Sequence, residues 1–398
     1  MRNRLPLEGI KVLDLNRFLP GQYAAMLMAE AGAEVIKIED PGFRATIFRM
    51  LQGREASSEE EKKWNAVYVL DRGKKSLALD LKTDAGKEVF LRLAEKTDVI
   101  IEGFRPGVTK KLGIDYDTIK EMNSKVIYCA VTGYGQDGPY QMLPARDLTC
   151  MGLSGILGVV NEGRFPPIVP GTKIADLASS MYCTIGILMA LAARDKSGRG
   201  QFVDISMVDG AVSWLTAPLM NYYFSGNVPG PGAVYLSGKR PGYNVYRTKD
   251  GKYISIALRE PKFWKKLCNK LGRGDLLPLQ NPDDDKFDEV VSALQEVFLS
   301  KTRDELFEEF KDIGVGKVYT LDELDSDPQI RHRRMIVDID VPGVGMVKQA
   351  GNPVKLSDTP LEIRSLSPAR GQHTMDILLE AGYSEERIKE FYENDVVA

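Results

Sequence analysis

The first third of the chain alternates strand-like and helix-like segments, and this alternation constrains the fold more than any other feature. Residues 10–15 and 34–39 are short apolar runs rich in β-branched side chains, and the Ala- and Met-rich segment 20–32 lies between them. Further strand-like runs follow at 76–81, 98–104 and 125–135. Because strand–helix–strand units join parallel strands, the pattern predicts an α/β fold with a doubly wound sheet.

A second region of different character follows a segment dense in Gly and Pro at residues 224–243. Two strand-like runs surround the Lys-Asp-Gly turn at 249–251. Helix-like segments come next, at about 261–271, 285–298 and 303–312. This order predicts a smaller α+β domain in the middle of the chain.

The domain boundaries follow from these changes of pattern. We predict a large domain whose N-terminal part is 1–222, and a small domain with its linkers at 223–334. Residues 335–398 hold a β-rich stretch and a final helix, and we expect them to return to the large domain. The charged segment 57–64 (SSEEEKKW) is predicted to be a loop.

Composition excludes several classes of function. The chain has 53 basic and 56 acidic residues, so its net charge of −3 indicates no nucleic-acid partner and no membrane surface. The longest apolar window, 181–193, is shorter than a bilayer span, and the N-terminus has no signal-peptide pattern. The two histidines, His332 and His373, lie far apart and predict no metal site. Four widely spaced cysteines without a CxxC motif indicate reduced thiols and a cytoplasmic protein.

One acidic residue opens the longest apolar segment of the chain. Asp176 precedes about five turns of apolar sequence, which end in the Gly-rich stretch 197–201. By its local pattern alone, an Asp before a helix is most often an N-cap. The alternative is a carboxylate that performs chemistry, which fits a chain so poor in histidine.

Three long stretches carry a family resemblance. Residues 7–39, 71–140 and 174–211, together with GQHTMDIL at 371–378, resemble the class III CoA-transferases, the family of formyl-CoA transferase, carnitine CoA-transferase and α-methylacyl-CoA racemase. The resemblance implies a Rossmann-like large domain, a smaller domain from the middle of the chain, and an interlocked dimer. The partner would be an identical chain or, as in some family members, a related one.

The resemblance also implies a reaction. It identifies Asp176 as the catalytic carboxylate, with coenzyme A thioesters and carboxylic acids as substrates and with no prosthetic group or metal. A carboxylate that attacks a thioester gives an anhydride, and this keeps the acyl group activated without ATP. Two alternatives stay open: an acyl-CoA racemase or epimerase, and a CoA-binding, non-catalytic subunit of a heteromeric transferase.

Arg146 distinguishes this chain from the racemases. They carry Gly-His-Asp before a short helix, and their histidine is an acid/base, whereas this chain has Ala-Arg-Asp at 145–147. Arginine stays protonated and is no base. Arg146 either pairs with Asp147 or a backbone carbonyl, or holds the carboxylate of a dicarboxylic substrate such as succinyl-CoA or a substituted succinate. Arg17 is a second candidate for that role, and Glu260, which matches a racemase glutamate, either orients groups or caps a helix.

The resemblance places the CoA site after the first strands. The predicted contacts are Leu19, Pro20, Leu79, Asp80, Leu81, Lys82, Gly103, Phe104, Arg105, Lys111, Leu143, Pro144 and Ala145. Where the family often has an arginine after the second strand, this chain has Asp40, so we expect Arg44, Lys74 or Lys75 to supply the charge for the 3′-phosphate. The Gly-rich loop 227–233 is either a lid over the intermediate or an interdomain linker.

Overall fold

The computed structural model describes residues 5–41, 57–160, 167–229, 238 and 240–398. The chain divides into two compact units. The first comprises Met1–Ser154, Thr172–Ser213 and Arg331–Ala398, and the second comprises Gly155–Gly171 and Trp214–Ile330. The C-terminal segment therefore belongs to the same unit as the N-terminal one.

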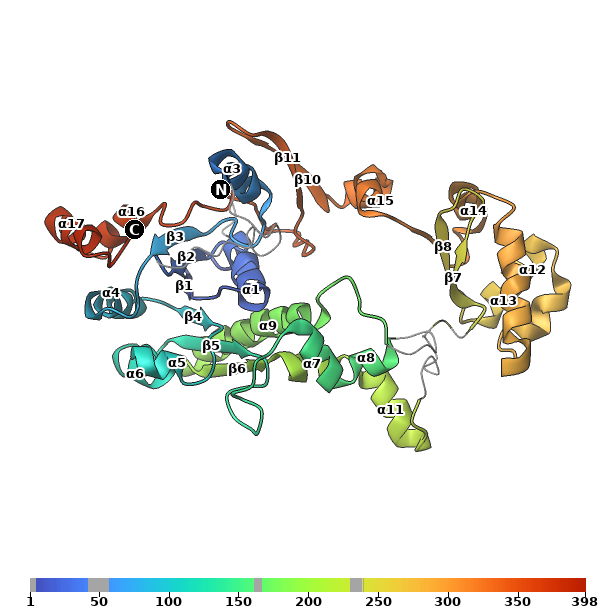
Figure 1. The fold of residues 1–398 in the computed structure, drawn as a ribbon, viewed down its shortest axis with the longest axis horizontal. Helices are drawn as coiled ribbons and strands as arrows, with labels where there is room; N and C mark the ends of the chain where they lie inside the picture. Colours follow the sequence, from blue (N-terminus) through green and yellow to red (C-terminus); the bar gives the residue numbers. More distant parts are fainter. Residues whose placement is uncertain (1–4, 42–56, 161–166, 230–237, 239) are drawn as a thin grey trace. The chain divides into compact units, whose positions relative to one another are not determined.

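A six-stranded parallel sheet forms the centre of the first unit (Figure 1). Its order is β3-β2-β1-β4-β5-β6, and every neighbouring pair is parallel. The strands are β1 (Lys11–Asp14), β2 (Glu34–Glu39), β3 (Lys75–Ala78), β4 (Val99–Glu102), β5 (Ile127–Thr132) and β6 (Phe202–Ser206). This confirms the predicted α/β fold with a parallel sheet, and the strand order reverses between β1 and β4.

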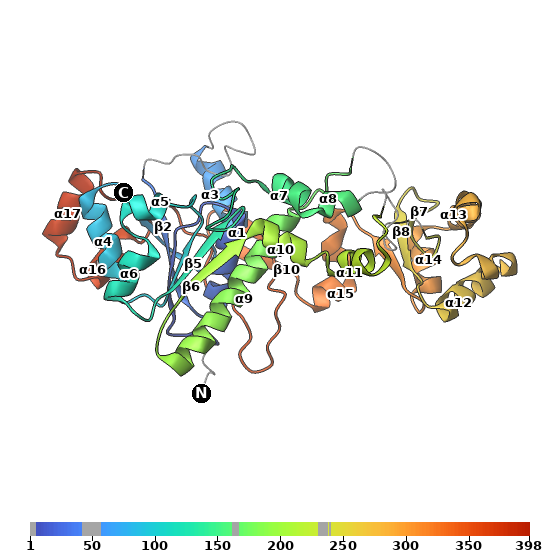
Figure 2. The ribbon, with the colours of Figure 1, turned by 90° about the horizontal axis from the view of Figure 1, so that it is seen from below.

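Helices cover both faces of this sheet (Figure 2). On one face, α1 (Leu19–Glu30) and α9 (Ile174–Ser197) pack around Met28, Cys129 and Ile187. The other face packs around Phe90, Tyr128 and Ile377, and its helices are α4 (Asp84–Ala94), α6 (Tyr116–Met122), α16 (Thr374–Glu380) and α17 (Glu385–Glu393). The unit also contains α3 (Ser58–Val67), α5 (Val108–Leu112), α7 (Asp147–Ser154), α10 (Met207–Ser213) and the antiparallel hairpin of β10 (Ile336–Val341) and β11 (Gly345–Ala350).

The charged segment 57–64 is a helix, so its prediction as a loop is wrong. Ser57 accepts a hydrogen bond from the backbone of Glu60, and the Glu60 side chain bonds back to the backbone of Ser57. This capping box satisfies orphan amides of the first turn, and Trp64 stacks on Tyr68 at the other end. The run of charged residues suggested a loop, although the capping box between Ser57 and Glu60 marks the start of a helix.

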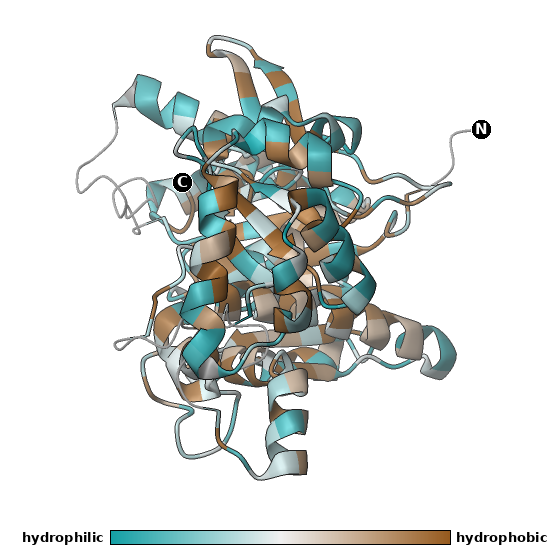
Figure 3. Ribbon diagram, turned by 90° about the vertical axis from the view of Figure 1, so that its right-hand side faces the viewer, coloured by the Kyte–Doolittle hydropathy of each residue, from teal (hydrophilic) through white to brown (hydrophobic). Residues whose placement is uncertain are grey.

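The second unit is built on a three-stranded antiparallel sheet in the order β7-β8-β9. Its strands are β7 (Tyr243–Arg247), β8 (Tyr253–Ala257) and β9 (Val315–Val318), and Trp264, Phe298 and Phe310 lie in its core. The predicted helices are present as α12 (Pro261–Leu271), α13 (Asp284–Phe298) and α14 (Arg303–Phe310). Figure 3 shows apolar and polar residues alternating around the helices, as expected for elements that bury one side.

The described residues also form several short elements. They are α8 (Ile156–Val159), α11 (Thr216–Ser225), the 3₁₀ segments Gly274–Leu279 and Leu321–Ser326, and α15 (Pro328–His332).

Helix α9 is the one described helix long and apolar enough to cross a membrane. The helix runs for 24 residues and is therefore longer than the apolar window 181–193 identified in the sequence. Half of its apolar window is buried, and it packs against α1, β5 and β6. Such packing is typical of a core helix in a globular domain.

Candidate active site

Asp176 lies inside the first turn of α9 rather than at its cap. The helix begins at Ile174, its N-cap residue is Lys173, and no side chain makes a capping bond there. The interpretation of Asp176 as an N-cap is therefore wrong. The residue is 8% exposed, and one carboxylate oxygen lies 3.7 Å from Nζ of Lys173.

A second carboxylate holds the backbone of Asp176. The N–H of Asp176 donates to Oδ1 of Asp147 at 3.0 Å, and Asp147 is itself the first residue of α7. The starts of two helices thus meet at two acidic residues. The unpaired amides of a helix start carry partial positive charge, which stabilises negative charge placed beside them.

The groups around Asp176 shift the pKa of its carboxyl in opposite directions. Burial raises the pKa of its carboxyl above the ordinary value, and the charge of Asp147 adds to that rise. The cationic groups of Lys173 and Arg146 act in the opposite direction. The result is a carboxylate that is more basic than a solvated one and has two cations near it, as a nucleophile that passes through anionic intermediates requires.

Arg146 reaches this region with an exposed guanidinium. Its Nη1 donates to the carbonyl of Ala145 at 2.8 Å, and its guanidinium carbon lies 5.3 Å from the ring centroid of Phe18. The ring of Phe18 is itself 47% exposed. Arg146 thus contacts the carbonyl of its neighbour Ala145. The side chain of Asp147 accepts a hydrogen bond from the N–H of Asp176 instead.

The turn after β1 packs tightly against the turn after β4. The buried amide of Asn16 donates to Oδ1 of Asp14 at 2.8 Å and to the carbonyl of Ile101 at 3.0 Å. A Cβ at Gly21 would lie 2.0 Å from Oδ1 of Asn16, and one at Gly103 would lie 2.7 Å from it. Both positions therefore require glycine, and the two turns meet where the strand order reverses, which is the usual ligand site of such sheets.

Most of the predicted CoA contacts lie at this carboxyl edge of the sheet. Leu19 and Pro20 open α1, Leu79–Lys82 follow β3, and Gly103–Arg105 follow β4. Lys82, Arg105 and Lys111 are exposed and accessible to phosphates, whereas Leu79 and Pro20 are buried. Leu79 lies in the core, its N–H donates to the carbonyl of Glu39, and it is bridged to Val397, so its side chain is not accessible to a ligand.

Three further predicted contacts precede Arg146. Leu143 is 50% exposed, and Pro144 and Ala145 follow it directly. The hydroxyl of Tyr134 donates to the carbonyl of Pro144 at 3.4 Å. This bond ties the segment to the chain that leaves β5.

Asp40 organises two cations at the same edge. Its Oδ2 accepts from Nη2 of Arg17 at 3.1 Å and from Nζ of Lys82 at 3.2 Å. The aspartate thus stands between two predicted ligand-binding side chains.

Of the three other cations expected near the 3′-phosphate, the two lysines pair with carboxylates elsewhere. Lys74 is completely buried and bonds to Asp14 and Asp71, so its predicted contact is wrong. Lys75 begins β3 and pairs with Glu34, the first residue of β2, so it lies at the opposite edge of the parallel sheet. Arg44 lies outside the described residues.

Glu102 holds the loop Gly103–Arg105 by a hydrogen bond. It ends β4, is 3% exposed, and its Oε2 accepts the N–H of Phe104 at 2.6 Å. Burial raises the pKa of this carboxyl to about 7. Sequence reasoning did not select Glu102, although its place between a buried strand and a predicted ligand loop is visible in the sequence.

Two predictions fall in or near the second unit. Glu260 is exposed and stands at the N-cap position of α12, but its side chain makes no capping bond. Of the loop 227–233, residues 230–233 lie outside the described residues, so its role as a lid or a linker stays a prediction. In the described part of the chain, no group of three or more His, Cys, Asp or Glu residues is arranged to hold a metal ion.

Comparison with known proteins decides the family. Residues 7–374 match the model of CoA-transferase family III. This chain belongs to that family. The match confirms the resemblance, and the family is one of enzymes that use CoA thioesters as substrates.

Curated relatives of this family III protein include both transferases and racemases. The succinate–glutarate CoA-transferase of Agrobacterium fabrum is 31% identical, over 96% of this chain and 97% of the relative. The succinyl-CoA:mesaconate CoA-transferase of Haloarcula hispanica is 31% identical, over 94% and 96%. The human α-methylacyl-CoA racemase is also 31% identical, over 99% and 98%.

Solved structures agree with the family III fold. A CaiB/BaiF family protein from Brucella suis has a TM-score of 0.80 and 29% identity, over 95% of this chain and all of that one. A protein from Mycobacterium tuberculosis has a TM-score of 0.78 and 26% identity, over 95% of this chain and all of that one.

Proposed function

We propose that this protein is a CoA-transferase that moves CoA from an acyl-CoA donor to a carboxylic acid acceptor through Asp176. The observation that carries the proposal is the pairing of two features in one place. Asp176 is a buried carboxylate with a raised pKa in the first turn of α9, and the cation near it, Arg146, is not a base. The names of the transferase relatives support the same reaction.

The reaction proceeds by exchange at the Asp176 carboxyl. A carboxylate oxygen of Asp176 attacks the thioester carbonyl, the C–S bond breaks, and CoA thiolate leaves behind a mixed anhydride. The thiolate then attacks the aspartyl carbonyl, which releases the donor acid and leaves an aspartyl-CoA thioester. The acceptor carboxylate attacks this thioester, and the released thiolate takes the acceptor acyl group as the new acyl-CoA. Asp176 returns as a carboxylate, so no ATP is consumed.

The surroundings of Asp176 suit these steps. The amides at the start of α9 and the guanidinium of Arg146 stabilise the oxyanion that forms at each attack. Asp147 fixes the backbone of Asp176 through its N–H, so the nucleophile enters each step from one position.

Dicarboxylic acids are the substrate class that we propose. Arg146 and Arg17 are both exposed, and a guanidinium binds a carboxylate through two parallel hydrogen bonds. Succinyl-CoA as donor and a substituted succinate as acceptor fit two such groups. The CoA moiety would lie along the carboxyl edge of the sheet, where Lys82 and Arg105 meet its phosphates.

A dimer, interlocked as in the family, is also proposed. Ile185, Leu188 and Met189 form an apolar stripe on α9 and are 43%, 43% and 67% exposed in the single chain. A stripe of this kind indicates a partner that covers it. Light scattering of the purified chain tests this: a mass of two chains supports the homodimer, and a monomer indicates a related partner chain. A cytoplasmic location remains part of the proposal.

The experiment that tests the function uses the purified chain alone. It is mixed with succinyl-CoA and a panel of mono- and dicarboxylic acids, and each new acyl-CoA is measured by liquid chromatography and mass spectrometry. Transfer by the wild-type chain and none by Asp176→Asn supports the proposal. The racemase alternative, which the human relative represents, predicts exchange of the α-proton of 2-methylacyl-CoA with D₂O instead. A chain that binds CoA but does neither is a non-catalytic subunit.

A further inference from the structure

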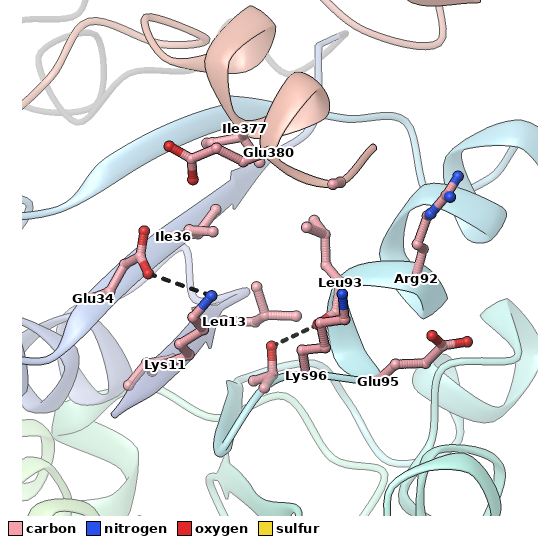
Figure 4. A pocket seen from close by; sticks show the side chains of 13 residues that line it. Lys11, Leu13, Glu34, Ile36, Arg92, Leu93, Glu95, Lys96, Ile377 and Glu380 are labelled. Atoms are coloured by element: carbon pink, nitrogen blue, oxygen red, sulfur yellow. Dashed lines mark hydrogen bonds and ion pairs between the residues drawn. The ribbon is translucent and has the colours of Figure 1, made fainter. Parts of the chain in front are cut away.

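A cavity lies at the edge of the sheet opposite the proposed active site. It has a volume of about 230 Å³ and opens between the starts of β1 and β2, the end of α4 and the end of α16 (Figure 4). Its floor is apolar and consists of Leu13, Ile36, Leu93 and Ile377. All of its walls belong to the first unit.

Two ammonium groups face each other across this floor. Figure 4 shows Lys11 from β1 and Lys96 from the end of α4 extending toward the cavity from opposite sides, with Leu13 and Leu93 between them. Arg92 and Glu95 point away from the centre. Like charges on two sides of an apolar floor favour an anion between them.

The acidic residues of the rim do not cancel this charge. Glu34 has its close partner in Lys75, at 2.7 Å, and lies 3.8 Å from Lys11. Glu380 also pairs with Lys75, at 3.4 Å. The rim thus carries three ammonium groups, of Lys11, Lys75 and Lys96, against these two carboxylates, which leaves one positive charge. No ion pair to Lys96 is recorded among the described residues.

The size of the cavity limits the ligand. An engineered apolar cavity of about 150 Å³ holds benzene, while pockets for drug-sized ligands begin at about 300 Å³. A volume of 230 Å³ therefore takes an aliphatic chain of about six to eight carbons. It is too small for an acyl-CoA.

We propose that this cavity is a second binding site, for a short aliphatic carboxylate whose chain lies on the apolar floor and whose carboxylate lies between Lys11 and Lys96. The site is independent of the proposed reaction. The two sites share strand β1, which continues from Lys11–Leu13 at the cavity into Asp14 and the turn of Asn16 at the carboxyl edge.

Calorimetric titration of the full chain with octanoate tests the proposal. We expect saturable binding of octanoate and much weaker binding of octylamine, octanol and succinate, which lack the negative charge or the chain. Lys11→Gln and Lys96→Gln should each weaken octanoate binding about two- to fivefold, as expected for exposed charge pairs. Lys87→Gln, on the same helix α4 but outside the cavity, is the matched control and should bind as wild type.

A steric variant gives an independent test. Ala381→Leu narrows the cavity from the α16 side without altering any charge and should abolish octanoate binding. Unchanged affinity in the Lys11→Gln/Lys96→Gln double variant and in Ala381→Leu would show that octanoate binds elsewhere, the active site included, and would overturn the proposal. Transfer activity is measured separately, so failure here leaves the proposed reaction untouched.

Discussion

Asp147 and Asp176 are joined by one hydrogen bond, from the backbone N–H of Asp176 to Oδ1 of Asp147 at 3.0 Å. The bond fixes the backbone of the proposed nucleophile, and the charge of Asp147 adds to the rise that burial causes in the pKa of Asp176. The two effects can be separated by substitution.

Asp147→Asn keeps an acceptor oxygen but removes the charge. The pKa of Asp176 should fall, so the acidic limb of the kcat/KM profile should move to lower pH. Asp147→Ala also removes the acceptor, and kcat should fall about tenfold, which is the usual worth of one hydrogen bond. If both variants keep the wild-type pH profile and kcat, Asp147 has no part in positioning Asp176.

Arg146→Ala tests the selection of dicarboxylates. We expect kcat/KM for dicarboxylic acceptors to fall about tenfold to a hundredfold, because the two charged hydrogen bonds between guanidinium and carboxylate are lost. Monocarboxylic acceptors should be affected much less. Arg146→Lys keeps the charge but not the fork and should recover only part of the loss. Equal losses for both classes of acid would contradict the role.

Lys82, which shares Asp40 with Arg17, is predicted to contribute to CoA binding alone. Lys82→Gln should raise KM for the acyl-CoA about three- to tenfold and leave kcat unchanged, because the phosphates contribute binding alone. An acyl-pantetheine thioester, which lacks the nucleotide, should show no change. Lys389→Gln on α17, where the lysine is 78% exposed, is the control. A similar KM increase with acyl-pantetheine would place Lys82 away from the phosphates.

Glu102 predicts a dependence of stability on pH. Its pKa is about 7 in the folded chain against 4.5 in a solvated one, because burial disfavours the charge. Between these values the folded chain binds more protons than the unfolded chain, so this residue's contribution to stability falls as the pH rises from about 5 to about 7.

Glu102→Gln removes that cost while its amide oxygen still accepts from Phe104. The variant should be more stable than wild type by about 1–3 kcal/mol at pH 8 and by much less at pH 5, as measured by urea unfolding. Glu95→Gln, an exposed residue of the same unit, controls for charge alone. Parallel stability curves for Glu102→Gln and wild type across this range would show that Glu102 is not buried as a titrating carboxyl.

The parallel sheet was predictable because its signals are local. Residues 10–39 show a strand, a helix and a strand in their own composition, and the structure has these elements within a few residues of the predicted bounds. The helix at Ser58–Val67 was missed because its charge concealed the capping box between Ser57 and Glu60.

The site was predictable only in part, because its contacts are distant in sequence. Asp147 and Asp176 are 29 residues apart, and no local pattern shows that one holds the other's backbone. Lys74 was a candidate cation for the 3′-phosphate, but it is buried in an ion pair with Asp14, 60 residues away. The resemblance indicated which residues matter, while the structure shows how Asp147, Asn16 and Glu102 support them.

The most direct test of the central claim is covalent trapping at Asp176. The purified chain is mixed with succinyl-CoA, treated with hydroxylamine or borohydride, digested, and analysed by mass spectrometry. An anhydride or aspartyl-CoA thioester predicts a hydroxamate, or a reduced side chain, on the peptide that contains Asp176, and no change in Asp176→Asn. An unmodified Asp176 peptide under conditions where the enzyme transfers CoA would contradict the account.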